Sequence, residues 1–463
     1  MYLLLSELSK YFITILLALY TLECFISFRF KKQKNNLFYV RQWIYIFAIQ
    51  FFAFYTMYVK QPKLIAEAIG DYLNIKTENL EVASYIVFFL FIQLVFVLMI
   101  SISLLLLENC NRLLLNNMCM LLGIGFIIQT RMSAYRAIKQ LTMVIISLIL
   151  ALIIIGILGK IKHLPDFIHF YSVFGIGILA IVLVMGNITH GSKLSFSIAG
   201  LTFQPSEFIK LLFVFFLASA LYEKTNFTNI LFTAVIAGMH VIILVLSKDL
   251  GSALIFFVAY ICIVFMATDN FGYLLLGIAG FCIASVVAYR LFYHVRVRVL
   301  AWQDPFAYID KEGFQITQSL FAIGSGNYFG LGLFGGLPKD IPYVETDFVF
   351  SAICEEMGVI AGICILLICI SSFIMMMNIG LHLKDEFLRL LSAGFAVIYI
   401  FQIFLTIGGG IKMIPLTGVT LPFISYGGSS LLTSIVLFYL VEWIYSRYCE
   451  EGGAPLEKGK QKA

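Results

Sequence analysis

Long, almost uninterrupted runs of apolar residues dominate this 463-residue chain and limit what it can fold into. Hydrophobic residues make up 61% of the sequence and charged residues 12%, with a mean hydropathy of +0.98. Soluble domains carry about 25% charged residues, so a lipid bilayer is the expected solvent. Windows long enough to cross its hydrocarbon core predict thirteen spans. The predicted spans are 11–28, 43–59, 84–107, 113–129, 142–159, 170–186, 206–222, 227–246, 250–268, 271–291, 347–377, 387–407 and 429–447.

Helices are the architecture that these spans predict. Hydrocarbon offers no hydrogen-bond partners, so each segment must satisfy its own backbone groups. The alternating pattern of an outer-membrane barrel is absent from the sequence. We therefore expect an all-α polytopic membrane protein with a ten-helix core and about three extra N-terminal transmembrane helices.

Positive charge predicts the orientation. The first span lacks a preceding basic region, the reverse of a cleavable signal peptide, and it is followed by Arg29, Lys31, Lys32, Lys34 and Arg41. Under the positive-inside rule this basic segment is cytoplasmic, which places the N-terminus and segment 292–346 outside and the C-terminal tail inside. Arg131, Arg136 and Lys139 do not fit this orientation, because it would place these cations outside. Either the count of spans near residues 108–141 is wrong or these cations have a task there.

The chain divides most naturally into three parts, without a soluble domain or a repeat of fixed period. Residues 1–108 form an N-terminal three-span membrane extension. Residues 109–448 form a ten-span core with a large extracellular loop, 292–346. Residues 449–463 form a polar cytoplasmic tail.

Cysteine usage and charge argue against two classes of function. The nine cysteines are scattered, with no C-x-x-C motif and no neighbouring histidine, so no metal site is predicted. The net charge of +5 is small for this length, and no cluster of Lys and Arg with interleaved aromatics lies on a soluble segment. We therefore expect no nucleic-acid partner.

Segment 292–346 is the one long interruption of the apolar sequence, and it combines charged, aromatic and glycine residues. A loop of this length is usually functional or disordered. Its aromatic and apolar content argues against disorder. The segment is therefore a candidate for function.

Glu207 and Lys210 are ionisable residues inside a predicted span, which marks functional sites by default. Pro205 suits the first turn of the helix, and Glu207 follows near its positive end. Residues three apart share a helix face and can pair. The pair is either a structural ion pair or part of a polar cavity wall that holds a charged ligand.

Other carboxylates lie at the ends of predicted spans. Asp249, after Lys248, is either a helix cap or a carboxylate that projects into the same cavity. Asp347 suits the capping position at the start of the predicted span 347–377. Glu355 and Glu356 are adjacent and cannot face the same way, so at least one needs a partner or a watery cavity.

The sequence GGGIKMIPLTGVTLPFISYGGSS, which contains Lys412, Ser425 and Ser429, combines glycines and prolines near the C-terminus. This composition predicts a broken, re-entrant segment. Such backbone is tolerated at membrane depth only where it is buried in protein or lines an aqueous cavity.

Five motifs, taken in order, give a resemblance to a known family: QPSEFIKL (204–211), KDLGSALI (248–255), GFQITQSLFAIGSG (313–326), TDFVFSAICEEMG (346–358) and PLTGVTLPFISYGGSS (415–430). Together they resemble the SEDS family of shape, elongation, division and sporulation proteins (FtsW/RodA/SpoVE). The resemblance implies a SEDS-like ten-helix core in the bacterial cytoplasmic membrane. It also implies a peptidoglycan glycosyltransferase that polymerises lipid II outside this membrane and works with a class B penicillin-binding transpeptidase. The N-terminal three spans lie outside it.

The implied reaction needs a base for the attacking sugar 4-hydroxyl, and cations or a metal such as Mg²⁺ or Mn²⁺ for the departing pyrophosphate. A lipid-linked substrate also needs a groove that opens sideways to the membrane. Asp310 and Asp304 are the candidate bases. The candidate substrate-binding residues are Lys193, Glu207, Lys210, Asp249, Arg296, Arg298, Gln315, Asp347, Glu355, Lys412, Ser425 and Ser429.

One position departs from the family pattern. The resemblance implies an essential aspartate in the loop before the GFQ motif, but alignment without gaps places Tyr308 there. Asp310 lies two residues on, a displacement of up to about 7 Å along the chain. We therefore take Asp310 as the expected base and Asp304 as the alternative.

Two other functions fit the same features. A transporter of lipid-linked precursor would also have broken segments and intramembrane carboxylates, but the paired repeats common in transporters are absent from the sequence. Tyr308 fits an inactive scaffold of a cell-wall complex. A loop of carboxylates on one side of the membrane favours the enzyme.

Overall fold

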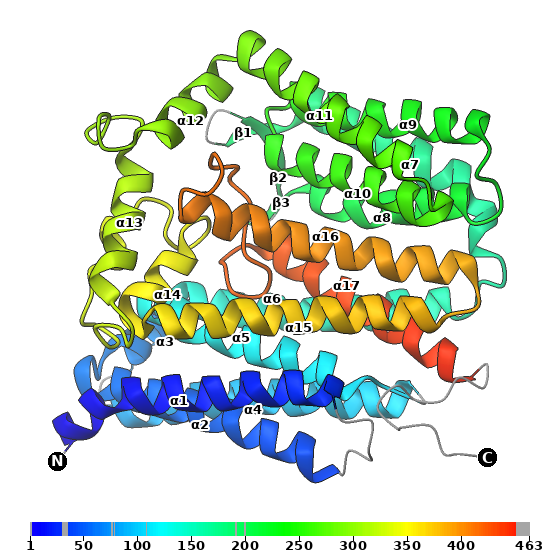
Figure 1. The fold of residues 1–463 in the computed structure, drawn as a ribbon. Helices are drawn as coiled ribbons and strands as arrows, with labels where there is room; N and C mark the ends of the chain where they lie inside the picture. The colour runs from blue at the N-terminus through cyan, green and yellow to red at the C-terminus, as the bar shows by residue number, and fades with distance from the viewer. Residues whose placement is uncertain are drawn as a thin grey trace.

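The computed structural model describes residues 2–29, 36–75, 77, 79–107, 109–189, 192–198 and 201–450 (Figure 1). The described helices are α1 (Tyr2–Arg29), α2 (Asn36–Lys60), α3 (Leu64–Leu73), α4 (Glu81–Leu106), α5 (Arg112–Met132), α6 (Ala134–Leu158), η1 (Leu164–Phe167), α7 (Ile168–Met185), α8 (Pro205–Leu221), α9 (Phe227–Leu246), α10 (Leu250–Thr268), α11 (Phe271–Leu291), α12 (Tyr293–Gln303), α13 (Phe314–Gly326), η2 (Pro338–Asp340), α14 (Val349–Met357), α15 (Val359–His382), α16 (Glu386–Gly410) and α17 (Gly428–Glu450). The strands are β1 (Asn187–Thr189), β2 (Ser192–Ile198) and β3 (Leu201–Phe203).

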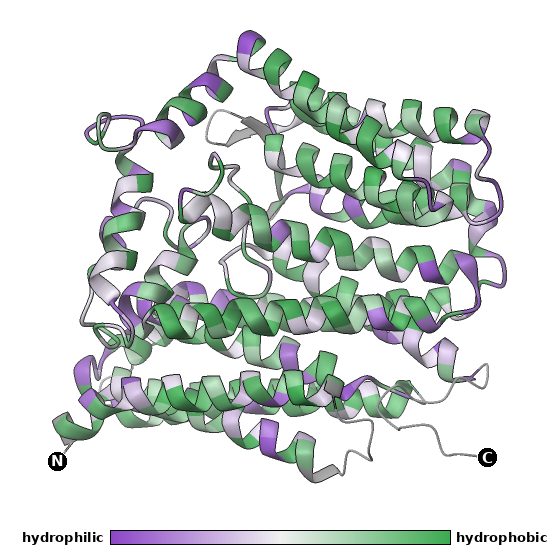
Figure 2. Ribbon diagram, viewed as in Figure 1, coloured by the Kyte–Doolittle hydropathy of each residue, from purple (hydrophilic) through white to green (hydrophobic). Residues whose placement is uncertain are grey.

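The long helices run side by side, with apolar residues along their lengths and polar residues concentrated near their ends (Figure 2). Among the described residues, twelve helices are long and apolar enough to cross a membrane, and α8, with 17 residues, occupies the remaining predicted span. The all-α polytopic membrane fold is confirmed. The N-terminus and helices α12 and α13 lie at one end of the bundle, as the predicted orientation requires (Figure 1).

The prediction of one continuous span over 347–377 is wrong, because the chain breaks at Gly358 between α14 and α15. Gly358 has a φ of +92°, a conformation that residues with a side chain rarely adopt. A Cβ atom there would lie 2.3 Å from the carbonyl oxygen of Tyr328. The break therefore lets the chain that follows α13 approach α14 closely.

Segment 292–346 is more regular than a loop. It forms α12, a turn and α13, and its later part is fastened along α14. The N–H groups of Leu331 and Gly332 donate to the carbonyl oxygens of Glu355 and Glu356, both at 2.9 Å. This backbone pairing fixes the outer end of the molecule.

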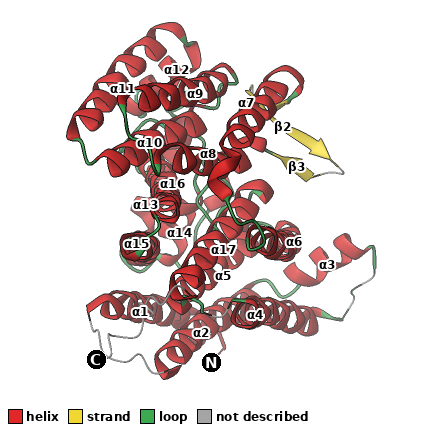
Figure 3. Ribbon diagram, turned by 90° about the vertical axis from the view of Figure 1, so that its right-hand side faces the viewer, coloured by secondary structure: helices red, strands yellow, loops and turns green. Residues whose placement is uncertain are grey.

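A small antiparallel sheet precedes α8 and was not predicted. Its strand order is β1-β2-β3, with Phe196 opposite Phe203 and Ile198 opposite Leu201. The sheet projects from the bundle beside α7 (Figure 3). It delivers the chain to Gln204, the residue before α8.

The N-terminal extension packs into the rest of the protein. α1 contacts α2 and α15, and α2 contacts α4 and α5. The central part of α5 is therefore fully buried between α2 and the helices of the core (Figure 1).

Asn117 on α5 connects the extension to the core through hydrogen bonds. Its Oδ1 accepts from the hydroxyl of Tyr20 on α1 at 2.9 Å. Its Nδ2 donates to the hydroxyls of Ser371 and Ser372 on α15, at 3.3 and 3.1 Å. These groups satisfy one another where neither water nor lipid could.

We expect Asn117→Ala to lower the free energy of unfolding by about 1–3 kcal/mol, because it leaves the buried hydroxyl of Tyr20 without its acceptor. Thermal unfolding in detergent tests this. Thr142→Ala, at an exposed position on α6, is the control and should change little. Equal unfolding temperatures for Asn117→Ala and the unmutated protein would contradict the role of this network.

Candidate functional site

An ion pair in the first turn of α8 is the starting point of the site. α8 begins at Pro205, whose missing N–H costs nothing at this position. Glu207 Oε2 and Lys210 Nζ lie 2.6 Å apart, and both side chains are buried. The i,i+3 spacing places them on one helix face, as predicted.

Lys210 also ties α8 to α16. Its Nζ donates to Gln402 Oε1 at 2.6 Å. Gln402 Nε2 in turn donates to Thr420 O at 3.0 Å and to Ser430 Oγ at 3.3 Å. The ammonium group thus begins a chain of hydrogen bonds that reaches the irregular segment 411–427 and the start of α17.

Asp249 both caps a helix and faces α8, so the two alternatives for this residue occur together. Its Oδ1 accepts from Ser252 N at 3.1 Å, which caps α10. Its Oδ2 accepts from Ser206 Oγ at 3.1 Å and from Gln204 Nε2 at 3.2 Å. Burial raises the pKa of Asp249, and the hydrogen bonds from Ser252 and Ser206 oppose that shift.

Arg298 on α12 brings a positive charge to the same place. Its Nη1 donates to Thr417 O at 3.1 Å. Burial lowers the pKa of Arg298, whereas the negative charges of Asp347 and Asp249 raise it. A Cβ atom on Gly418 would lie 3.7 Å from Asp347 Oδ2 and 3.9 Å from Arg298 Nη2, so the two charged groups meet at this glycine.

The break predicted between α16 and α17 is confirmed, and residues 421–425 of this irregular segment are buried in protein. Leu421 and Phe423 are buried, and a Cβ atom on Gly125 of α5 would lie 2.6 Å from the carbonyl oxygen of Phe423. Only glycine at position 125 allows this close approach.

Ser425, Ser429 and Lys412 hold this segment in place. Ser425 Oγ donates to Thr346 O at 2.5 Å, next to Asp347. Ser429 Oγ accepts from the backbone N–H of Gln204 at 2.9 Å. The carbonyl oxygen of Lys412 accepts from Trp302 Nε1 of α12 at 3.1 Å.

We call the resulting set of residues the outer polar cluster. Hydrogen bonds and charge join it across α8, α10, α12, α16, α17, segment 411–427 and the chain just before α14. Its members are Glu207, Lys210, Asp249, Arg298, Asp347, Gln402, Thr417 and Ser429.

The candidate bases lie outside the outer polar cluster. Asp304 and Asp310 are both exposed in the turn between α12 and α13, and Asp304 Oδ1 accepts from Ala307 N at 3.1 Å. In the part of the chain that the structure describes, no hydrogen bond or ion pair joins either carboxylate to the cluster. Asp304 is the C-terminal capping residue of α12, the helix that carries Arg298, and Asp310 follows in the same turn.

The side chains of Arg296 and Gln315 also lie outside the cluster. Arg296 is exposed, with its guanidinium 5.8 Å from the ring centre of Tyr293. Gln315 is half-buried on α13. The backbone of Lys193 lies in β2, and its side chain falls outside the described part of the structure.

Glu355 belongs to a second group on α14. Its Oε1 accepts from Leu337 N at 2.9 Å. The neighbouring Glu356 pairs with Arg131, with Nε and Oε1 2.8 Å apart and both side chains buried. Phe334 N also donates to Glu356 Oε1 at 3.1 Å, so the chain that follows α13 contacts both glutamates.

Two of the three cations that do not fit the predicted orientation form ion pairs. Arg131 pairs with Glu356, and Arg136 pairs with Glu345. The Arg131 guanidinium also lies 4.2 Å from the ring centre of Phe334. Both cations therefore have a task, because they fasten carboxylates at the end of the bundle where α12 and α13 lie.

Sequence reasoning missed Gln402 and Thr417. An amide inside the apolar run of α16 is a signal that could have identified Gln402. Thr417 contributes a backbone carbonyl, which no side-chain pattern reveals. Within the described residues, no three His, Cys, Asp or Glu side chains gather closely enough to hold a metal ion.

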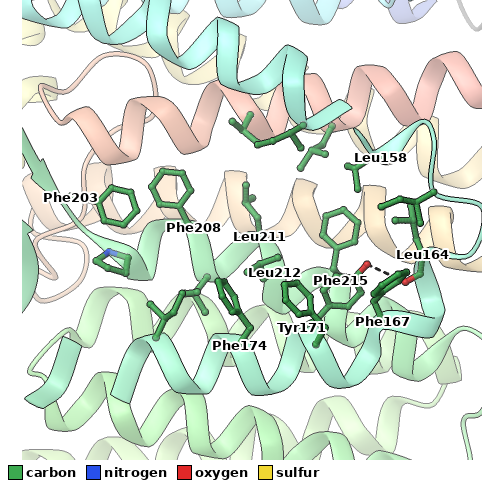
Figure 4. A pocket seen from close by; sticks show the side chains of 18 residues that line it. Leu158, Leu164, Phe167, Tyr171, Phe174, Phe203, Phe208, Leu211, Leu212 and Phe215 are labelled. Carbon is green, nitrogen blue, oxygen red and sulfur yellow. Dashed lines mark hydrogen bonds between the residues drawn. The ribbon is translucent and has the colours of Figure 1, made fainter. Parts of the chain in front are cut away.

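An apolar groove of about 590 Å³ begins at the first turn of α8, which also carries Glu207. It runs along α7 and α8, with α6 and α17 on its other side (Figure 4). Phe203 and Phe208 lie at one end, next to the first turn of α8, and Leu164 and Phe167 lie at the other. Phe167 and Phe174 are exposed, so the groove opens towards lipid.

A sequence model of the FtsW/RodA/SpoVE family, described as cell cycle proteins, matches residues 109–448. The chain belongs to this family. The match covers well over half of the sequence, and it begins after the three N-terminal membrane helices.

Relatives with names include the peptidoglycan glycosyltransferase RodA of Mycobacterium bovis, which is 35% identical over 274 residues. That match covers 54% of this chain and 57% of the relative, so the chain spans little more than half of it. The probable peptidoglycan glycosyltransferase FtsW of Alcanivorax borkumensis is 32% identical over 58% of this chain and 73% of the relative.

The fold is also similar to a solved structure described as "Structural coordination of polymerization and crosslinking by a peptidoglycan synthase complex". The TM-score is 0.63 at 26% identity, and the match covers 73% of this chain and 98% of the other. Family and fold together identify a multi-pass protein of the cytoplasmic membrane.

We expect Lys210→Met to lower the free energy of unfolding by about 3–5 kcal/mol, because it leaves the buried carboxylate of Glu207 without a cation. The double variant Glu207→Gln, Lys210→Met should recover most of this loss. Thermal unfolding compares the three proteins.

Arg389→Met is the matched control, since Arg389 and Glu386 form an exposed i,i+3 pair on α16. Its loss should cost at most about 1 kcal/mol. A single variant Lys210→Met as stable as the control would show that the buried pair does not hold α8.

Proposed function

We propose that this protein is a peptidoglycan glycosyltransferase that polymerises lipid II at the outer face of the cytoplasmic membrane. The observation that carries the proposal is the apolar groove that begins at the first turn of α8, the same turn that carries Glu207 of the outer polar cluster. Lipid II has the same division, with an isoprenoid chain on one side of a charged diphosphate and a sugar on the other. The names of the relatives support the same activity.

The groove suits the isoprenoid chain. Its lining is apolar along the length of α7 and α8, and it opens towards the lipid from which the substrate arrives. A chain placed there ends near Pro205, in the first turn of α8. The positive end of this helix dipole favours an anionic group.

Arg298 and Lys210 are the proposed partners of the diphosphate. Guanidinium groups bind phosphate oxygens in pairs, and Arg298 is already held by Thr417 O. Asp347 and Asp249 near Arg298 balance its charge before substrate binds.

Asp310 is the proposed base, with Asp304 as the alternative. The hydrophilic sugar must extend from the outer polar cluster into water, which is where the turn between α12 and α13 lies. Asp304 is engaged with Ala307 N, whereas Asp310 lies beyond it on the exposed turn. A base in this turn can remove the proton of the attacking 4-hydroxyl.

We further propose that the protein works with a class B penicillin-binding transpeptidase. The support is the fold of the solved peptidoglycan synthase complex, whose description names both polymerisation and crosslinking. Crosslinking requires peptides on a strand that has already been polymerised, so a polymerase and a transpeptidase act in sequence.

The test is conversion of labelled lipid II into glycan strands by the purified protein with its transpeptidase. We expect Asp310→Ala to reduce the rate by about 10²–10⁴-fold, the usual contribution of a general base. Asp340→Ala, an exposed aspartate of the same outer region, is the control and should retain activity.

Full activity of Asp310→Ala together with loss in Asp304→Ala would move the base to Asp304. No polymer from the unmutated complex, with lipid II flipping in vesicles, would replace the enzyme with a transporter.

A further inference from the structure

The outer end of α1 contacts the chain between α13 and α14. Lys10 Nζ donates to Gly330 O at 3.2 Å. The rings of Tyr11 and Phe329 lie 5.3 Å apart. These contacts join the N-terminal extension, which the family match does not include, to the outer region of the core.

The segment that α1 contacts, residues 328–336, is pressed against α14 and the Gly358 break. Its backbone approaches so closely that a Cβ atom on Gly330 would lie 2.3 Å from Glu356 O. A Cβ atom on Gly336 would lie 2.7 Å from the carboxyl carbon of Glu355. We call residues 328–336 the clamped segment. Gly330 and Gly336 let it pack closely against α14, and α1 contacts it at Phe329 and Gly330.

Lys10 also comes close to α14. It lines a small cavity together with Glu356 and Leu333. The outer end of α1 therefore contacts both the clamped segment and the helix against which this segment packs.

The clamped segment connects the helices that position the turn of the candidate bases. α13 packs on α14, and Ser319 Oγ lies 2.5 Å from Ser351 Oγ between them. At the start of α13, Thr317 Oγ donates to Pro305 O at 3.2 Å. Movement of the clamped segment would therefore move the turn that contains Asp304 and Asp310.

We propose that α1 is an intramolecular clamp, with Lys10 as a positioning residue that holds the clamped segment against α14. The clamp makes the N-terminal extension part of the working outer surface rather than an additional anchor. Its effect on glycosyl transfer rests on the proposed function, whereas its effect on the clamped segment does not.

Hydrogen exchange of the full-length protein in nanodiscs tests the clamp directly. We expect Lys10→Met to increase exchange of the Leu331 and Gly332 amides about tenfold, because a hydrogen bond from a charged group is lost. Lys10→Arg should restore protection. Lys60→Met, which removes a lysine of α2 paired with Glu7 at the same end, is the control and should leave these amides unchanged.

A second variant keeps the test decisive if Lys10→Met folds poorly. Tyr11→Ala removes a partly exposed ring and should also increase exchange in the clamped segment. Unchanged exchange of Leu331 and Gly332 in both variants would overturn the clamp.

Polymerisation of lipid II gives the second readout, expressed per folded molecule. Lys10→Met should lower kcat with KM unchanged, because the groove and the outer polar cluster are intact, and Lys10→Arg should restore kcat. Failure of the unmutated complex to make polymer would count against the proposed function, while the exchange result would still decide the clamp.

Discussion

Every charge inside this apolar bundle must find a partner within the protein, and Lys210 is the clearest case. Its ammonium group lies 2.6 Å from both Glu207 Oε2 and Gln402 Oε1. These contacts determine how α8 meets α16 and where the irregular segment 411–427 can lie. The same requirement explains the pairing of Arg131 with Glu356 at the outer end. Polar pairing, more than apolar packing, therefore specifies the outer half of the molecule, since lipid competes with apolar contacts.

This arrangement divides the outer surface into parts with different chemistry. The groove is apolar, the outer polar cluster is charged and mostly buried, and the turn with Asp304 and Asp310 is exposed. A lipid-linked sugar has the same three parts. The N-terminal extension adds a fourth element, because Lys10 reaches the chain that connects α13 to α14.

Much of the fold could be predicted from the sequence, because apolar length determines where helices cross a membrane. The spacing of Glu207 and Lys210 predicted their contact, and the glycines and prolines near Lys412 predicted the break before α17. The break at Gly358 was missed because its flanking residues are apolar, so only the close approach of Tyr328 O reveals why glycine is needed. The role of Thr417 was missed because it acts through its carbonyl. Arg296 and Arg298 looked equivalent in sequence, but the helix directs only Arg298 into the cluster.

That difference between two arginines tests the central claim most directly. The measurement is the affinity of the purified protein, in detergent, for a polyprenyl diphosphate. Because a charge-assisted hydrogen bond is worth about 1.5–3 kcal/mol, Arg298→Gln should weaken binding about tenfold or more. Arg296→Gln removes the same charge from an exposed position and should leave the affinity unchanged. Equal affinities for the two variants would contradict a diphosphate site at the outer polar cluster.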